Sequence, residues 1–350
     1  MLHRGRKEKW TSTKWAAVVV ATVFASALQP FVAGGSPIPA ITLYNGQHPQ
    51  TTMALVTAFE KSAPIRVRVR NGDEDDLANQ IVQEGAHSPA DVFYAENSPS
   101  LQFVDEKGLL SPVTPSTLAK VAANYNSPSG DWVGVTARLN GIVYNTKRLA
   151  PSALPASVMD LASANWAGKL GLAPGETDFL PVITSVVLAH GRPAALRWLQ
   201  ALKANAGSHV YPDNESLIAA VNNGAVAIAV MDHYYWYRVA YEVGSARLHS
   251  AFTTFAPLDP GYVLDVSGAA VLRSSRQQAV AQRFLAFLVS KEGQGIIAHS
   301  QSYEYPLGSG VTTTQPLRPP FGDLQPASLS IAGLGDGSTA VALLHQAQLL

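Results

Sequence analysis

Hydrophobic and polar positions follow two alternating periods along the chain, and these predict strands and helices in turn. The apolar segment 41–44 and the strictly alternating segment 65–70 predict two strands, and residues 51–60 between them predict an amphipathic helix. A helix at about 75–85 and a short strand at 91–94 complete a βαβαβ opening. Units of this kind build parallel sheets with right-handed crossovers.

The same alternation continues to the end of the chain. Strands are expected at about 132–145, at 225–230 directly before an aromatic helix start, and at 268–272; helices are expected at 179–190, 193–205, about 276–298 and 339–349. No Pro- or Ser-rich linker separates two halves. The pattern therefore predicts an α/β protein of two lobes joined by strands that cross between them, with ligands bound beyond the carboxyl ends of strands.

The N-terminus has the pattern of an export signal. Five basic residues and one acid stand within residues 1–15, and an apolar run of about 13 residues, too short to span a bilayer comfortably, follows at 16–28. Small residues offer cleavage after Ala27 or Ala33. We expect residues 1–35 to be a signal peptide and the mature chain to be periplasmic or otherwise extracytoplasmic. An uncleaved anchor is the alternative.

Composition narrows the classes of function. The 350 residues are 47% hydrophobic and carry 25 basic and 25 acidic side chains. Removal of residues 1–35 leaves 20 basic and 24 acidic side chains, a net charge of −4. This balance gives no support for nucleic-acid binding. The absence of cysteine excludes disulfides, thiolate metal sites and a Cys nucleophile. No motif of a hydrolase, a nucleotide-binding loop or a zinc site occurs, so no enzyme is expected.

Three predicted strands are followed by side chains with metal-binding chemistry. His48 comes after the first strand, Glu96 after the third, and Tyr234 and Tyr235 after the strand at 225–230. An imidazole, a carboxylate and two phenols suit hard trivalent iron, since phenolate at neutral pH needs a highly charged cation nearby. Each has a simpler explanation as a turn residue, a helix cap or aromatic packing.

At these residues the chain resembles the ferric-ion-binding proteins of bacterial iron importers, which are type II periplasmic solute-binding proteins of ABC transporters. The resemblance rests on the segments ITLYNGQH (41–48), PADVFYAE (89–96), YYWY (234–237), SGAAVL (267–272) and EYPL (304–307). It implies that His48, Glu96, Tyr234 and Tyr235 are iron ligands. It also implies a monomer that captures Fe³⁺, free or as a chelate, and delivers it to an ABC permease, with membrane contact only through that permease or an uncleaved signal.

The resemblance also implies a two-lobed type II fold with the ligand cleft between the lobes. The N-terminal lobe is expected at 36–138, with about 265–310 returning to it. The C-terminal lobe is expected at 139–264, with about 311–350 returning to it.

Members of this family often hold a synergistic anion such as carbonate, phosphate or citrate in a small-residue loop at a helix N-terminus. The corresponding loop at 174–179 carries two carboxylates, which would repel an anion unless they point outward and cap the helix. Arg138 and Thr177 are candidates for contacting the anion, with a surface ion pair as the alternative for Arg138. Asn214 and Asp232 are expected to surround the site.

Two other functions remain open from the sequence. The same fold carries thiamine, phosphonates and other small organic ligands, against which Tyr and Trp stack or form hydrogen bonds. A His, a carboxylate and phenolates can also form a mononuclear iron enzyme.

Overall fold

The structure is a computed structural model that describes residues 38–350 except 314, 317 and 318. The predicted signal peptide at 1–35 lies outside these residues. Among the described helices, none combines the length and apolar character that crossing a membrane requires.

The predicted βαβαβ opening is confirmed. It consists of β1 (Ala40–Asn45), α1 (Pro49–Ser62), β2 (Arg66–Asn71), α2 (Glu74–Glu84) and β3 (Val92–Ala95). β1 pairs in parallel with both β2 and β3. The carboxyl ends of these strands therefore meet at one edge of the sheet, which is where His48 and Glu96 follow.

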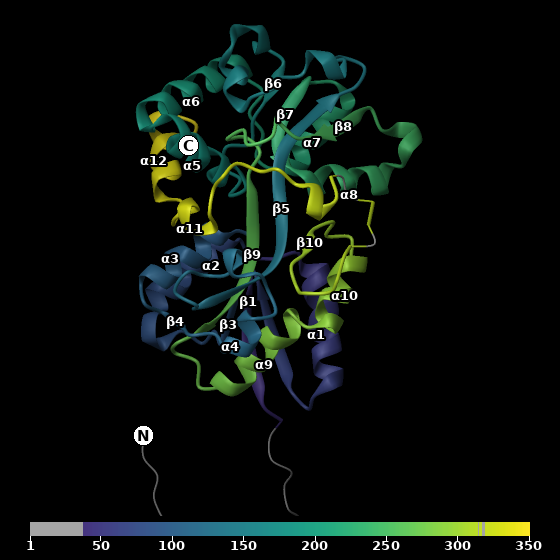
Figure 1. Ribbon diagram of the computed structural model, residues 1–350. Coiled ribbons are helices and arrows are strands. Elements are labelled where there is room, and N and C mark those ends of the chain that lie inside the picture. Colours follow the sequence, from purple (N-terminus) through teal and green to yellow (C-terminus); the bar gives the residue numbers. More distant parts are fainter. Residues whose placement is uncertain (1–37, 314, 317–318) are drawn as a thin grey trace, which may run out of the picture. The chain divides into compact units, whose positions relative to one another are not determined.

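Two long strands connect the two lobes, and Figure 1 shows them running lengthwise between the helices of the one and of the other. They are β5 (Trp132–Asn145) and β9 (Leu264–Leu272). β5 pairs with β9 through residues 132–139 and with β7 (Ile228–Asp232) through residues 140–144. The strand thus changes partner between Leu139 and Asn140. The predicted lobe limits stay a prediction, and this change of partner falls close to the predicted limit at residue 138.

The main path of the mixed sheet runs β2-β1-β3-β9-β5-β7-β6. β6 (Leu170–Gly171) ends this path, and β4 (Leu110–Ser111), β8 (Ser250–Thr253) and β10 (Tyr305–Pro306) pair beside it. The other helices are α3 (Ser98–Glu106), α4 (Pro115–Leu118), α5 (Phe179–His190), α6 (Arg192–Ala206), α7 (Asn214–Asn223), α8 (His233–Val243), α9 (Gln278–Leu288), α10 (Lys291–His299), α11 (Ile331–Leu334) and α12 (Ser338–Gln346). Short 3₁₀ segments lie at Gly85–His87, Ala123–Tyr125, Pro151–Ala153, Val158–Ala162, Ala164–Trp166, Ser245–Arg247 and Phe321–Asp323.

Two sequence-based boundaries were wrong. The single helix expected at about 276–298 is divided into α9 and α10, because Ser290 caps a new helix by accepting a hydrogen bond from the Gly293 amide. The strand expected at 225–230 begins at Ile228 and extends to Asp232, because the chain first turns after the left-handed Gly224 that ends α7.

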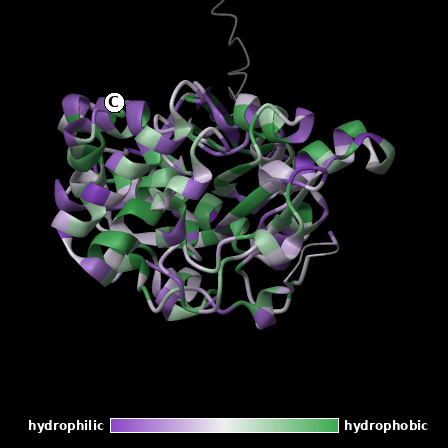
Figure 2. Cartoon of the chain, turned by 90° about the horizontal axis from the view of Figure 1, so that it is seen from above, coloured by the Kyte–Doolittle hydropathy of each residue, from purple (hydrophilic) through white to green (hydrophobic). Residues whose placement is uncertain are grey.

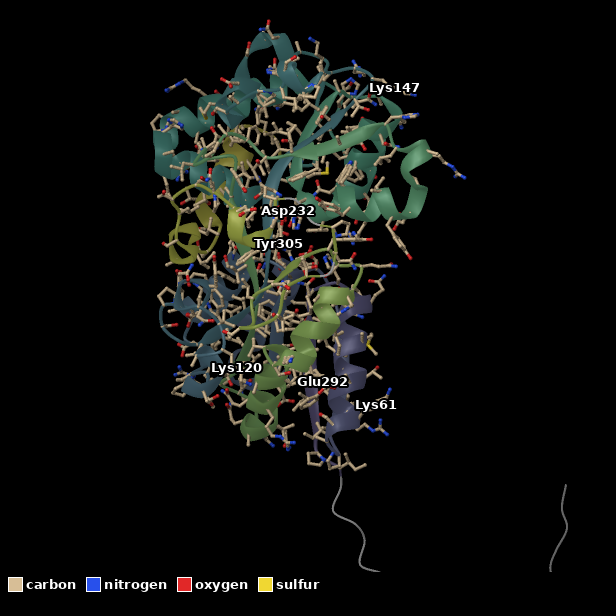
Figure 3. All side chains as sticks on the ribbon, turned by 45° about the vertical axis from the view of Figure 1, so that its right-hand side comes forward. Lys61, Lys120, Lys147, Asp232, Glu292 and Tyr305 are labelled. Atoms are coloured by element: carbon tan, nitrogen blue, oxygen red, sulfur yellow. The ribbon has the colours of Figure 1, made fainter. Side chains whose placement is uncertain are left out.

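The hydrophobic core follows the strands and the inner faces of the helices, with the apolar side chains of β1, β3, β5 and β9 almost entirely buried. Figure 2 shows hydrophobic positions gathered toward the middle and hydrophilic ones along the outer helices. Figure 3 places Asp232 and Tyr305 in the middle region, well away from the peripheral Lys61 and Lys147. An acid at this depth requires compensating partners.

Candidate metal centre

The four predicted ligands come together at the ends of β1, β3 and β7. His48 Nε2 lies 3.5 Å from Glu96 Oε1, and the His48 ring lies edge-on to the Tyr234 ring at a centroid distance of 4.9 Å. Tyr235 packs against Tyr234 with ring centroids 4.2 Å apart. The two tyrosines are in the first turn of α8, which begins directly where β7 ends. Segments nearly 190 residues apart in sequence therefore share one site, as the strand-end rule predicts.

His48 is prepared to act as an electron-pair donor. It stands at the N-cap of α1, its side chain makes no capping hydrogen bond, and its Nε2 is buried without a hydrogen-bond partner in the described structure. Burial lowers the pKa of His48 to about 4, so the imidazole is neutral at neutral pH. A neutral imidazole with an unused nitrogen is the form that binds a metal ion.

Tyr234 and Tyr235 are buried phenols in an acidic environment. Burial, followed by the charge of Asp178, raises the pKa of both well above the ordinary value. Both phenols are therefore protonated at neutral pH. The guanidinium of Arg238 lies over both rings, 4.9 Å from the Tyr234 centroid and 5.1 Å from the Tyr235 centroid.

Arg138 is completely buried at the centre of an acidic cluster, so the alternative of a surface ion pair was wrong. Its Nη1 lies 2.7 Å from Glu96 Oε1, and its Nη2 pairs with Glu304. Asp178 and Asp232 lie farther away, at 3.6 and 4.0 Å. Burial by itself would lower the pKa of Arg138, but the surrounding groups, with Glu96 and Glu304 first among them, together raise it well above its ordinary value. The role of this residue toward an anion stays a prediction.

In the loop at 174–179, the structure shows which way the two carboxylates point. Asp178 stands at the N-cap of α5 but makes no side-chain cap; its carboxylate points inward and is only 3% exposed. It accepts hydrogen bonds from the Tyr234 hydroxyl at 3.1 Å and from the amide of Asn214 at 3.3 Å. The Asn97 side chain donates to both Asp178 and the Thr177 hydroxyl. Asp178 therefore does not meet the condition of pointing outward and capping the helix, because partners from three other elements hold it inside.

Glu176, the other carboxylate of the loop, is half-buried and accepts a hydrogen bond from the Asn214 backbone amide at 3.3 Å. Burial and the charge of Asp178 raise its pKa to about 7. Asp232, which we expected near the site, is 1% exposed, and burial together with Asp178 raises its pKa well above the ordinary value. Acids packed this closely favour a bound cation.

Sequence analysis missed two residues of the site. Glu304 offers a carboxylate oxygen within 4.8 Å of ligand atoms of His48 and Glu96, and it also accepts hydrogen bonds from Gln47. The segment EYPL at 304–307 contributes to the family resemblance, but its local pattern assigns no role to the acid. Asp178 was considered only as a repellent charge. Neither position could be deduced from local pattern, since each depends on contacts across the sheet.

A cavity of about 320 Å³ borders the cluster and is lined by residues 45–49, Asn71, Gly72 and Glu96. A second, of about 480 Å³, is lined in part by His48, Arg238 and His299. Both cavities are lined in part by His48, and Glu96 also lines the first.

Comparison with known proteins gives a consistent result. Residues 54–316 match the family described as bacterial extracellular solute-binding protein. The chain is 36% identical over 310 residues to the Fe(3+)-binding periplasmic protein of Serratia marcescens, covering 89% of this chain and 90% of the relative. It is 35% identical to the major ferric iron-binding protein of Neisseria gonorrhoeae, covering 88% and 92%.

Solved structures agree with these relatives. Iron-bound HitA from Pseudomonas aeruginosa superposes with a TM-score of 0.84 at 41% identity, covering 88% of this chain and 99% of that protein. A Trichodesmium protein solved with iron and citrate has a TM-score of 0.77 at 30% identity, again covering 88% and 99%. The two-lobed α/β fold expected from the sequence is confirmed.

Proposed function

We propose, since the chain belongs to the bacterial extracellular solute-binding proteins and within them to the periplasmic ferric-iron-binding group, that it captures Fe³⁺ outside the cytoplasm and delivers it to an ABC permease. The relatives from Serratia and Neisseria are named for ferric iron binding, and the HitA structure contains iron. The role is capture rather than catalysis, and the protein acts as an exported monomer after removal of residues 1–35.

The observation that carries the proposal is the convergence of His48, Glu96, Tyr234 and Tyr235 from three strand ends. We propose that these four side chains coordinate the ion. Two phenolates and a carboxylate bring three negative charges, which offset the charge of Fe³⁺. Removing two phenolic protons costs free energy, because both tyrosines are buried and have raised pKa values. A divalent ion stabilises the resulting phenolates less than a trivalent ion does, so these four ligands favour the ferric state.

Four protein ligands leave two positions of an octahedral shell for water, another side chain or an anion. Carbonate, phosphate and citrate are the candidate anions, and citrate accompanies iron in the Trichodesmium structure. Arg138 would offset the charge of such an anion. Thr177 belongs to the 174–179 loop, and Asn214 donates hydrogen bonds to Glu176 and Asp178 of that loop. A stacked organic ligand and a mononuclear iron enzyme are not favoured by these relatives.

A ferric titration of the purified mature chain, followed by visible absorbance, tests the proposal. Tyrosinate bound to Fe³⁺ gives a charge-transfer band that neither component shows alone. The band should saturate at one iron per chain and be lost in Tyr234→Phe and in Tyr235→Phe. Tyr241→Phe is the matched control, since Tyr241 lies on the same helix and is 62% exposed. Absence of a band even with carbonate, phosphate or citrate would reject the proposal.

A further inference from the structure

Gln47, directly before the proposed ligand His48, is the centre of a buried hydrogen-bond network. Gln47 is 3% exposed, and its side-chain oxygen accepts a hydrogen bond from the His48 backbone amide at 2.6 Å. Its side-chain nitrogen donates to Ser267 Oγ at 2.8 Å and to Glu304 Oε2 at 3.2 Å. Both amide hydrogens and the amide oxygen therefore have partners, which fixes the orientation of the side chain.

Ser267 extends this network to the second proposed ligand that follows a strand of the βαβαβ unit. Its Oγ donates to the backbone carbonyl of Ala95 at 2.8 Å, and Ala95 directly precedes Glu96. Ser267 is completely buried on β9, at the first position beyond the ladder that β9 forms with β3. One hydroxyl therefore connects the residue before His48 with the residue before Glu96.

His48 depends on such support from its neighbours. Its side chain does not cap α1, and its Nε2 has no hydrogen-bond partner in the described structure. A metal-binding imidazole needs surrounding hydrogen bonds that fix its direction. Here they act on the backbone: Asn45 donates to the Gln47 carbonyl at 2.7 Å, and the Gln47 side chain accepts from the His48 amide. The position of the imidazole thus follows from the backbone that Gln47 and Asn45 fix.

Four of the five segments that carry the family resemblance meet in this network. Gln47 belongs to NGQH, Ala95 to PADVFYAE, Ser267 to SGAAVL and Glu304 to EYPL. Two of these segments, SGAAVL and EYPL, contain none of the four proposed ligands. Their residues lie up to 257 positions from Gln47, so only the folded chain brings them to the ligands.

We infer that Gln47 and Ser267 are positioning residues, which hold His48 and Glu96 at the separation that lets both bind one ferric ion. His48 Nε2 and Glu96 Oε1 lie 3.5 Å apart. At metal–ligand distances of about 2.0–2.2 Å, two ligand atoms at right angles lie about 3 Å apart, so the network holds the pair near the required spacing. This inference rests on the proposed function and deepens it, and the experiment below separates the failure of one from that of the other.

The first test is a double-mutant cycle on iron affinity, measured by competition against a chelator. Gln47→Met has a similar length without the hydrogen bonds; it should keep the tyrosinate band at one iron per chain but bind iron about tenfold or more weakly. In a His48→Ala background the same substitution should change affinity less than about threefold, because a residue that acts through His48 loses its effect once the imidazole is absent. An equal loss in both backgrounds, or wild-type affinity of Gln47→Met, would overturn the inference.

A second variant removes a single hydroxyl, so the test does not depend on the folding of Gln47→Met. Ser267→Ala should also weaken iron binding about tenfold. Ser250→Ala is the matched control, since Ser250 is likewise buried on a strand, at 4% exposed, and its hydroxyl donates to Asn222 at 3.0 Å. Urea unfolding should show similar losses of stability in these two variants, and only Ser267→Ala should lose iron affinity.

Equal iron affinities of Ser267→Ala and Ser250→Ala would overturn the inference while leaving the proposed function intact, provided that the wild-type chain shows the charge-transfer band. A wild-type chain without that band would overturn the proposed function and the inference together.

Discussion

Arg138 Nη1 lies 2.7 Å from Glu96 Oε1, so a completely buried guanidinium holds the carboxylate that we propose as an iron ligand. Arg138 stands near the end of the β5 segment that pairs with β9, directly opposite Asp265. Its other nitrogen pairs with Glu304. Arg138 therefore partly balances the charge of these acids by itself, which allows them to be buried beside one another.

Replacement of Arg138 should destabilise the empty protein. Arg138→Met should lower the free energy of unfolding by about 3–5 kcal/mol, because it leaves Glu96 and Glu304 without their buried cation. Urea unfolding of the iron-free chain measures this. Arg66→Met is the control: its side chain is 66% exposed and pairs with Glu60 at 3.2 Å, so it should cost no more than about 1 kcal/mol. Equal losses in the two variants would contradict the role of Arg138.

Iron affinity should depend steeply on pH. Burial raises the pKa values of Tyr234 and Tyr235, so both phenols are protonated in the empty protein and binding one ferric ion displaces about two protons near neutrality. Protons favour the empty form, and the apparent affinity should fall roughly 100-fold for each pH unit of acidification. Near pH 4 His48 adds a third competing proton, since its pKa is about 4.

Competition against a chelator, corrected for the chelator's own protonation, gives the number of protons released. Tyr241→Phe should have the wild-type slope. An affinity that does not change between pH 7 and pH 5 would show that the phenols do not bind the ion as phenolates.

Loss of His48 should weaken iron binding without removing the colour. His48→Ala should reduce affinity about 100-fold or more, because a direct ligand is lost, while the phenolates that give the band remain. Chelator competition and absorbance together separate this effect from that of the tyrosine variants. His87→Ala, at an exposed imidazole in another part of the chain, should match wild type. Unchanged affinity in His48→Ala would remove His48 from the ligand set.

Gly46 should be intolerant of a side chain. A Cβ at this position would lie 2.5 Å from Glu74 Cβ and 2.9 Å from its Cα, so Gly46→Ala should cost about 1–3 kcal/mol of stability by forcing α2 away from the end of β1. Gly175→Ala, where a Cβ meets nothing within 4 Å, should stay within about 0.5 kcal/mol of wild type. Thermal or urea unfolding compares the two. A tolerated alanine at position 46 would show that Glu74 can move freely.

The sequence pattern predicted the elements of this protein well where local physics decides them. The two-residue period at 65–70 and the apolar run at 41–44 gave β2 and β1, and strand-end logic selected His48, Glu96 and the two tyrosines as neighbours. The prediction of one helix at about 276–298 was wrong at Ser290, where a single capping hydrogen bond divides a continuous helical pattern into α9 and α10.

The direction in which an acidic side chain points does not follow from the local sequence pattern, because it depends on contacts with residues that are distant in the sequence. Asp178 stands at a helix start, where the sequence left open whether it caps the helix, and hydrogen bonds with Asn97, Asn214 and Tyr234 from other elements hold it facing inward. The chain by itself determined the order of strands and helices and the chemical nature of the donors, because backbone periodicity and side-chain type are local. Only the tertiary structure decided which acids surround Arg138 and which face the tyrosines. Buried charged groups need ion-pair or hydrogen-bond partners, and here segments distant in the sequence supply those partners.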